Sequence, residues 1–175
     1  ALSLELLPED EYKVLLPDKI NDLRLKLAEI QEWQDSIMIK TLKMACTKFR
    51  ANKSVQETMD VVNIQTEINL NYLDTSFSII RYLAWSIPSI GFIGTVMGIS
   101  GALGHVDQAA AGDLSAVTSL LGTAFDTTLV ALLLSILLMF RIHRVQQIEE
   151  HFIITVQDYL MTNFVNRIYV PKAER

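Results

Sequence analysis

The part of the sequence that most constrains the fold is residues 114–140, a run that carries no charge except at Asp126. As an α-helix this run is roughly 40 Å long, and the hydrocarbon core of a bilayer is about 30 Å thick, so the run predicts a transmembrane helix. Asp126 then lies near the middle of the membrane, where a carboxylate costs about 2.5 to 3.5 kcal/mol to insert. We therefore expect Asp126 to face protein or water and to belong to an ion path.

A second uncharged stretch, residues 82–104, is also long enough to span a bilayer. Pro88 lies inside it and removes one backbone hydrogen bond, so we expect a kink there, with a hinge as the alternative. Glycines recur at three- and four-residue steps along the span and mark a face that a neighbouring helix can approach closely. They are Gly91, Gly94, Gly98 and Gly101.

The charges beside the two stretches predict their orientation. Arg81 precedes the pair, Arg141 and Arg144 follow it, and the loop 105–113 contains no Lys or Arg. Because positive charge stays on the cytoplasmic side, we expect both outer ends in the cytoplasm and the loop in the periplasm. Asp113 is a suitable cap for the helix that follows the loop.

The remaining residues predict helices. Apolar residues at helical spacing favour one amphipathic helix from residue 18 to about residue 49, and Ser54 with Glu57 has the spacing of a capping box at the start of another. That second helix should continue without a break into the first span. Residues 1–17 are expected to form a packed or interfacial lead-in.

The predicted fold class is an all-α membrane protein, in which long helices form a two-helix transmembrane hairpin that continues into a cytoplasmic helical bundle. The expected segments are a cytoplasmic helical region, a first span, a periplasmic loop, a second span and a cytoplasmic C-terminal helix. Their residues are 1–81, 82–104, 105–113, 114–140 and 141–175.

Composition excludes several functions. The net charge of −5 offers no basic surface for nucleic acid, and Cys46 is the only cysteine, so there is no disulfide framework. No Cys/His cluster has metal-ligand spacing, and no glycine-rich phosphate loop or nucleophile with a nearby base is present. We expect no enzymatic activity.

Counting along the two spans predicts a polar layer in the membrane. Thr95 and Thr123 both lie about 13 to 14 Å below the outer surface of an antiparallel hairpin. Ser119, Thr123 and either Asp126 or Thr127 share one helix face. Hydroxyls above a carboxylate suit a proton relay or a small cation, with sodium at Thr95, Thr123 and Asp126 as one arrangement.

A purely structural role is the alternative for the hydroxyls. Thr and Ser in membrane helices often donate to their own backbone, and this alternative applies to Thr118, Thr127, Thr128 and Ser135 individually. Asp126 is harder to explain in this way, because neither span contains a cation to pair with it. Two helices cannot enclose such a site, so we expect a homo-oligomeric ring.

Two motifs resemble those of a known family. Residues 91–99, GFIGTVMGI, resemble the glycine-threonine-valine-x-glycine-isoleucine motif of ExbB and TolQ proteins. Residues 119–124, SLLGTA, resemble the leucine-x-threonine-alanine motif of their last membrane helix, and Pro88 is placed like the proline of MotA. Over residues 85–144 the chain resembles the MotA/TolQ/ExbB proton channel family.

The resemblance implies a homopentamer in the bacterial inner membrane, surrounding the single membrane helices of a partner dimer similar to MotB, ExbD or TolR. In that family the partner carries an aspartate that takes up the ion, and the hydroxyls that match Thr95 and Thr123 lie near it. The implied activity is coupling of proton or sodium flow to mechanical work. No cofactor is expected beyond the translocated H⁺ or Na⁺.

The chain departs from the family pattern in three ways. Asp126 stands where ExbB-like sequences usually have a small residue, and residues 125–129, FDTTL, are similar to ZorA-type defence motors. The family also has at least one further span upstream, which we expect either to lie before Ala1 in a longer protein or to be missing here.

Two other functions stay open at this point. A transporter component that acts without rotation would move ions without a one-helix partner. A structural membrane scaffold would keep its function after Asp126→Asn and Thr123→Val.

Overall fold

The computed structural model describes Leu7, residues 14–29 and residues 36–170. Along the chain these form α1 (Pro17–Glu29), α2 (Ile37–Asn52), α3 (Val55–Leu103), α4 (Val106–Ala110), α5 (Ser115–Asn163) and the 3₁₀ helix η1 (Val165–Arg167). The chain divides into two compact units. Unit 1 comprises the residues up to Leu73 together with those from Ile148 onward, and unit 2 is Asp74–Gln147.

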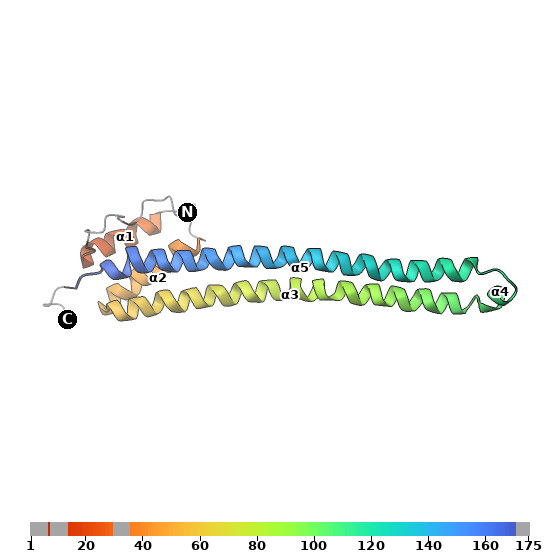
Figure 1. The fold of residues 1–175 in the computed structure, drawn as a ribbon. Coiled ribbons are helices and arrows are strands. Elements are labelled where there is room, and N and C mark those ends of the chain that lie inside the picture. Colours follow the sequence, from red (N-terminus) through yellow and green to blue (C-terminus); the bar gives the residue numbers. More distant parts are fainter. Residues whose placement is uncertain (1–6, 8–13, 30–35, 171–175) are drawn as a thin grey trace. The chain divides into compact units, whose positions relative to one another are not determined.

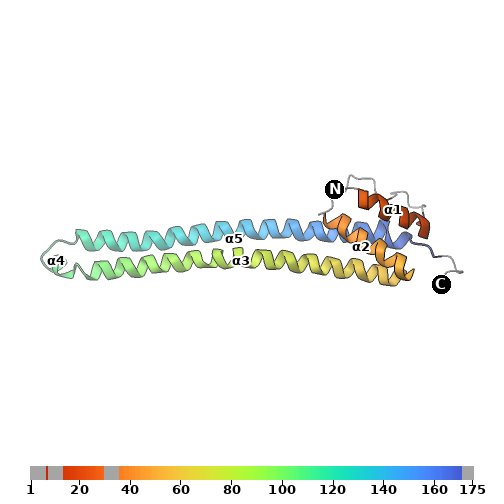
Figure 2. The same ribbon diagram turned by 180° about the vertical axis from the view of Figure 1, so that it is seen from behind.

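The two long helices α3 and α5 lie side by side in both views of the ribbon (Figure 1, Figure 2). Each is 49 residues long, and each contains a stretch long and apolar enough to cross a membrane. Only 11% of the residues in each stretch are buried. A core helix of a soluble protein would be mostly buried, so these apolar surfaces need lipid or further protein. The predicted all-helical hairpin is confirmed.

The start of α3 uses half of the predicted capping box. The backbone N–H of Glu57 donates to Oγ of Ser54 at 3.3 Å, as the spacing predicts. The Glu57 carboxylate turns instead to Nζ of Lys48, 2.8 Å away, and to the side-chain amide of Asn52. These two donors lower the pKa of Glu57, Lys48 more than Asn52. From this start α3 is helical through Pro88 to Leu103.

The predicted loop 105–113 contains a short helix, α4. Gly112 follows α4 at φ +100°, a left-handed conformation that glycine adopts without strain. At the start of α5 an Asp113 carboxylate oxygen accepts the backbone N–H of Ser115 at 3.0 Å and its hydroxyl at 2.5 Å. These hydrogen bonds, the hydroxyl first, lower the pKa of Asp113.

Unit 1 corrects one prediction, the single helix from residue 18 to about residue 49. The chain instead forms α1 and α2, which pack against each other, and residues 30–35 between them lie outside the described residues. Periodicity alone could not separate the two, because both bury apolar residues at helical spacing. The core they share with α5 is formed mainly by large side chains that include Ile20, Leu27, Leu42, Phe49, Leu160 and Phe164.

The lead-in is packed where it is described. Leu7 and Leu15 are buried in the core of unit 1, and Leu15 forms an isolated parallel bridge with Ile168. Its N–H donates to the carbonyl of Arg167 at 2.8 Å. The other residues before 14 lie outside the described part of the chain. The helix predicted for residues 141–175 ends at Asn163, and residues 171–175 are also outside the description.

Two leucines of α1 provide a matched test of this core. Leu27 is fully buried and Leu25 is 50% exposed on the same helix. We expect Leu27→Ala to destabilise unit 1 by about 2 to 5 kcal/mol, because it removes buried surface and leaves a cavity. Leu25→Ala should cost under about 1 kcal/mol. Hydrogen exchange of α1 and α2 amides measures both, and equal loss of protection in the two variants would contradict this core.

Candidate functional site

In unit 2 the backbones of α3 and α5 come close together at three glycines. A Cβ built on Gly98 would lie 2.5 Å from Cβ of Ala124 and 2.9 Å from the carbonyl oxygen of Leu120. One built on Gly91 would overlap Cβ of Ala131. One built on Gly94 would lie 2.7 Å from Oγ1 of Thr127. No larger residue fits these places unless α5 moves.

The packing around Gly101 is looser than around these three glycines. A Cβ there would be 3.5 Å from the nearest atom of Leu120, which is ordinary van der Waals contact. The close approach of the helices therefore covers Gly91 to Gly98 and relaxes beyond it.

Between the contact glycines, two threonines form a polar layer across the helices. Oγ1 of Thr95 donates to the carbonyl of Ala124 at 3.0 Å, and Oγ1 of Thr128 donates to the carbonyl of Gly91 at 3.0 Å. The two hydroxyls also contact each other. In the low-dielectric interior of a membrane such cross-helix bonds fix the register of α3 against α5.

This layer differs from the predicted one, which paired Thr95 with Thr123. The predicted depth is nearly right, since Thr95 bonds to Ala124, the residue after Thr123. The predicted face of the helix is wrong. Ala124 and Thr128 lie one helical turn apart and point to α3, whereas Thr123 is exposed and donates to the carbonyl of Ser119 at 3.0 Å. Sodium ligands from Thr95, Thr123 and Asp126 are therefore not brought together within one chain.

The spacing of small residues in the sequence also indicates that Thr128 meets Thr95. On α3 the order is Gly91, Thr95, Gly98, and on α5 the same spacing recurs as Ala124, Thr128, Ala131. Small residues that bracket a threonine on both members of an antiparallel pair indicate that the two threonines meet. Ser135 also bonds between the helices, because its hydroxyl donates to the carbonyl of Ala84 on α3 at 3.3 Å.

Three of the predicted ion-path residues line one open groove. Thr123, Asp126 and Thr127 face a hollow of about 670 Å³ between α3 and α5, whose remaining walls are glycines and apolar side chains. Ile90, Gly94 and Met97 are among those walls. Ser119 lies one turn before Thr123, outside the groove, and Pro88 directly follows Ile87, which lines the groove.

The side-chain oxygen atoms in the groove can accept hydrogen bonds but have no free hydrogen atom to donate. Oγ1 of Thr127 donates to the carbonyl of Ala124 at 2.8 Å, and the hydroxyl hydrogen of Thr123 is used at Ser119. Their lone pairs stay available. Within residues 7, 14–29 and 36–170 the Asp126 carboxylate has no hydrogen-bond or ion-pair partner. An arrangement of acceptors alone suits a proton or a cation.

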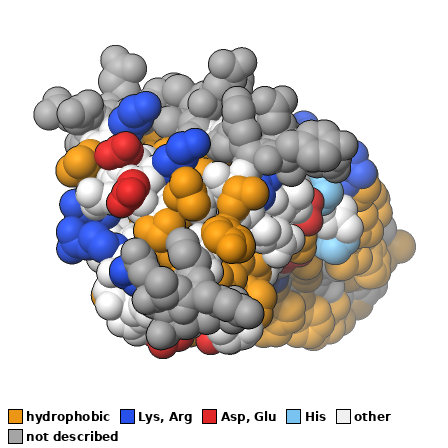
Figure 3. All heavy atoms as spheres, turned by 90° about the vertical axis from the view of Figure 1, so that its left-hand side faces the viewer, with side chains coloured by type: hydrophobic (Ala, Val, Ile, Leu, Met, Phe, Trp, Pro, Cys, Tyr) orange, Lys and Arg blue, Asp and Glu red, His pale blue; other side chains and the backbone are white. Residues whose placement is uncertain are grey.

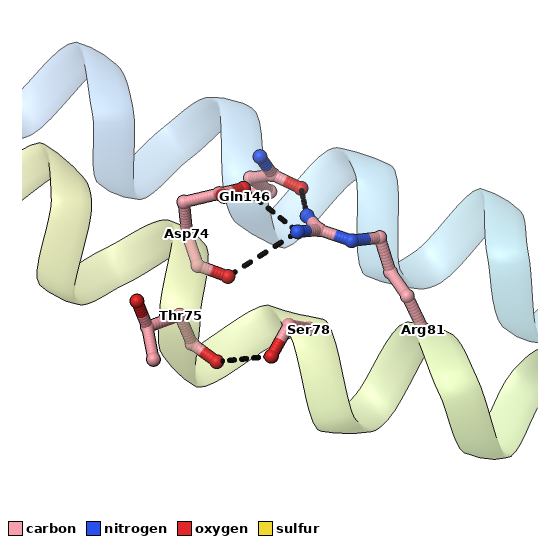
Figure 4. Close-up of polar contacts among 5 residues, drawn as sticks. All are labelled: Asp74, Thr75, Ser78, Arg81 and Gln146. Atoms are coloured by element: carbon pink, nitrogen blue, oxygen red, sulfur yellow. Dashed lines mark hydrogen bonds and ion pairs between the residues drawn. The ribbon is translucent and has the colours of Figure 1, made fainter.

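Arg81 is occupied elsewhere in unit 2 (Figure 4). Its Nη2 pairs with the Asp74 carboxylate at 2.7 Å, and its Nη1 donates to Oε1 of Gln146 at 3.0 Å. The guanidinium thus joins α3 to α5 where the charged part of each helix meets its apolar part. In the part of the chain that the structure describes, no group of three or more His, Cys, Asp or Glu residues is placed to hold a metal.

The paired helices with their groove agree with a comparison against protein families. The model of the MotA/TolQ/ExbB proton channel family matches residues 29–158, which is most of the chain. The chain belongs to this family. No curated protein and no solved structure matches it.

Membership in the MotA/TolQ/ExbB family makes this a membrane protein and not an enzyme. Members are ion-channel motor subunits, and they typically act with MotB-, ExbD- or TolR-like partners. The match covers α2, α3, α4 and most of α5, so the glycine contact, the threonine layer and the groove all lie in the family region.

The closest helix contact gives a reciprocal test. Gly98→Ala should weaken the α3–α5 pairing by about 1 to 3 kcal/mol, because its new methyl group overlaps Ala124. Ala124→Gly in the same chain should recover part of this loss, because it removes the overlap with Cβ of Ala124 but not the one with the carbonyl oxygen of Leu120. Gly122→Ala, which meets no atom within 4 Å, should be neutral or slightly stabilising.

Thermal denaturation in detergent would measure these variants. A Gly98→Ala protein as stable as the parent, or one that Ala124→Gly does not rescue, would contradict the contact.

Proposed function

We propose that this chain is a stator-like subunit that couples proton or sodium flow across the bacterial inner membrane to mechanical work on or by a partner protein. The observation that carries the proposal is the Asp126 carboxylate without a partner, beside Thr123 and Thr127 in one groove of an apolar helix pair. Such a carboxylate is retained at membrane depth only where it meets water, a proton or a cation.

The proposed arrangement in the membrane follows the charges. Residues 82–104 and 114–140 are the spans, residues 105–113 lie in the periplasm, and Arg81, Arg141 and Arg144 mark the cytoplasmic side. The flanking regions, 1–81 and 141–175, are then cytoplasmic. Most residues of the apolar stretches are exposed in one copy, which supports an assembly of several copies.

The proposed assembly is a homopentamer around a dimer of a single-span protein similar to MotB, ExbD or TolR. One elementary charge that crosses 100 mV releases about 2.3 kcal/mol, enough to bias steps between nearly equivalent arrangements of ring and partner. Ser119 would extend the line of polar groups from the groove toward the periplasmic end. Thr95 would act indirectly, by fixing the helix register with Thr128.

Asp126→Asn should abolish ion-coupled work while the oligomer still assembles, because the amide keeps the shape of the side chain but cannot take up or release a proton near neutral pH. Ion flux into vesicles that contain the chain and its partner measures the coupling. Size-exclusion chromatography with light scattering measures the assembly. Full flux in Asp126→Asn would favour a structural scaffold, and flux without any one-helix partner would favour a transporter that does not rotate.

A matched pair of threonines separates the groove from general helix structure. Thr123 and Thr118 each donate to the carbonyl four residues earlier, but only Thr123 lines the groove. We expect Thr123→Val to lower ion flux at least about tenfold, the loss typical of one positioned polar group. Thr118→Val should leave the flux nearly unchanged. Equal fluxes in the two variants would count against the ion path.

A further inference from the structure

Charge is divided between the helices of unit 1. α2 carries Lys40, Lys43, Lys48 and Arg50 and no acidic residue. The part of α3 in this unit carries Glu57, Asp60 and Glu67 and no basic residue. A chain of net charge −5 thus holds one wholly basic helix beside a wholly acidic segment. Such a division offers two complementary surfaces.

The basic surface is the outward face of α2. Lys40 and Lys43 are exposed, and Met44, which follows Lys43, is 44% exposed although it is a large apolar side chain. Lys43, Met44 and Thr47 line a hollow of about 470 Å³. Figure 3, which views the molecule from the α1 and α2 side, shows basic side chains along one side and exposed hydrophobic side chains near the centre.

The acidic surface is a stripe on α3 formed by Asp60, Ile64, Glu67 and Ile68. Ile64 is 55% exposed and Ile68 is 40% exposed. At 100° per residue, Asp60 and Glu67 lie about 140 to 160° around α3 from Val62, which is fully buried. The stripe therefore faces away from the core of its own copy.

Neighbouring residues of α3 show that α2 and α5 do not cover the stripe. Glu57 is turned to α2, where it pairs with Lys48. Asn63 is turned to α5, where its Oδ1 accepts Nε2 of Gln157 at 2.9 Å. Asp60 and Glu67 point between these two directions, on the outer side of the helix.

The charges of both surfaces are available. Among the described residues, Lys40, Lys43 and Glu67 form no ion pair, and Asp60 accepts one hydrogen bond, from Gln56 at 3.3 Å. The one pair that these helices do form, Lys48 with Glu57 at 2.8 Å, shows that α2 and α3 side chains match in charge and reach.

We propose that the basic face of α2 (Lys40, Lys43, Met44 and Thr47) docks on the acidic stripe of α3 (Asp60, Ile64, Glu67 and Ile68) in a second copy of this chain. Because the two surfaces differ, the contact is heterologous, and its repetition forms a ring when the rotation between copies returns to the first copy. The apolar residues supply the centre of the interface, and the charges around them select register and partner. The inference deepens the oligomer of the proposed function by naming its contact outside the spans.

Disulfide formation between two kinds of copy tests the contact directly. A full-length chain with Met44→Cys is coexpressed with one of different tag length that carries Ile64→Cys, and the membranes are oxidised. We expect a disulfide dimer that contains both tags, and none when Leu25→Cys replaces Ile64→Cys. Cys46 should not interfere, because burial raises its pKa to about 12 and keeps the thiol protonated. Absence of the mixed dimer would overturn the inference.

Charge exchange then tests the pairing. In the Met44→Cys copy, Lys40→Glu with Lys43→Glu should lower the mixed dimer at least about tenfold, because like charges would then face each other. Asp60→Lys with Glu67→Lys in the Ile64→Cys copy should restore it. Lys19→Glu with Lys26→Glu on α1 makes the same charge change and should have no effect. Loss with the α1 control, or no restoration by the exchange, would overturn the pairing.

These results are independent of the ion path. If the mixed dimer fails to form while Asp126→Asn still abolishes ion flux, the interface is wrong and the proposed function stands. If the dimer forms and Asp126→Asn retains flux, the interface stands and the motor function is wrong.

Discussion

The close contact between Gly98 and Ala124 is the constraint on which the rest of unit 2 depends. Gly98 has no room for a Cβ and Ala124 is fully buried, so the backbones of α3 and α5 lie close together here. At this separation Oγ1 of Thr95 reaches the carbonyl of Ala124 and Thr128 reaches that of Gly91. Steric contact fixes the distance between the helices, and the threonine layer fixes their register.

This register also decides which polar groups face outward. With Ala124 and Thr128 against α3, the rotation of α5 places Thr123, Asp126 and Thr127 at the open groove. The hydroxyls of Thr123 and Thr127 donate their hydrogens to backbone carbonyls, so the groove offers a bound ligand only hydrogen-bond acceptors. Packing on one face of α5 thus decides which polar groups line the groove on the adjacent face.

A single copy leaves much apolar surface uncovered. Only 11% of the residues in each spanning stretch are buried, and in unit 1 Ile64 and Met44 are exposed beside unpaired charges. Lipid can cover the first surface but cannot satisfy Asp126, and a charged rim favours protein over lipid at the second. An assembly of copies answers both needs, which links the proposed ring to the proposed ion path.

The sequence by itself determined the features that depend on local chemistry. These include two helices long and apolar enough to cross a membrane, the helix start at Ser54, the hydrogen bonds of Asp113 to Ser115, and a carboxylate inside the second apolar stretch. Only the tertiary structure decided that Thr95 meets Thr128 instead of Thr123, and that residues 18–49 form two packed helices. Helical periodicity predicts which residues share a face, but the rotation of a helix against its neighbour depends on where side chains leave room for the other backbone.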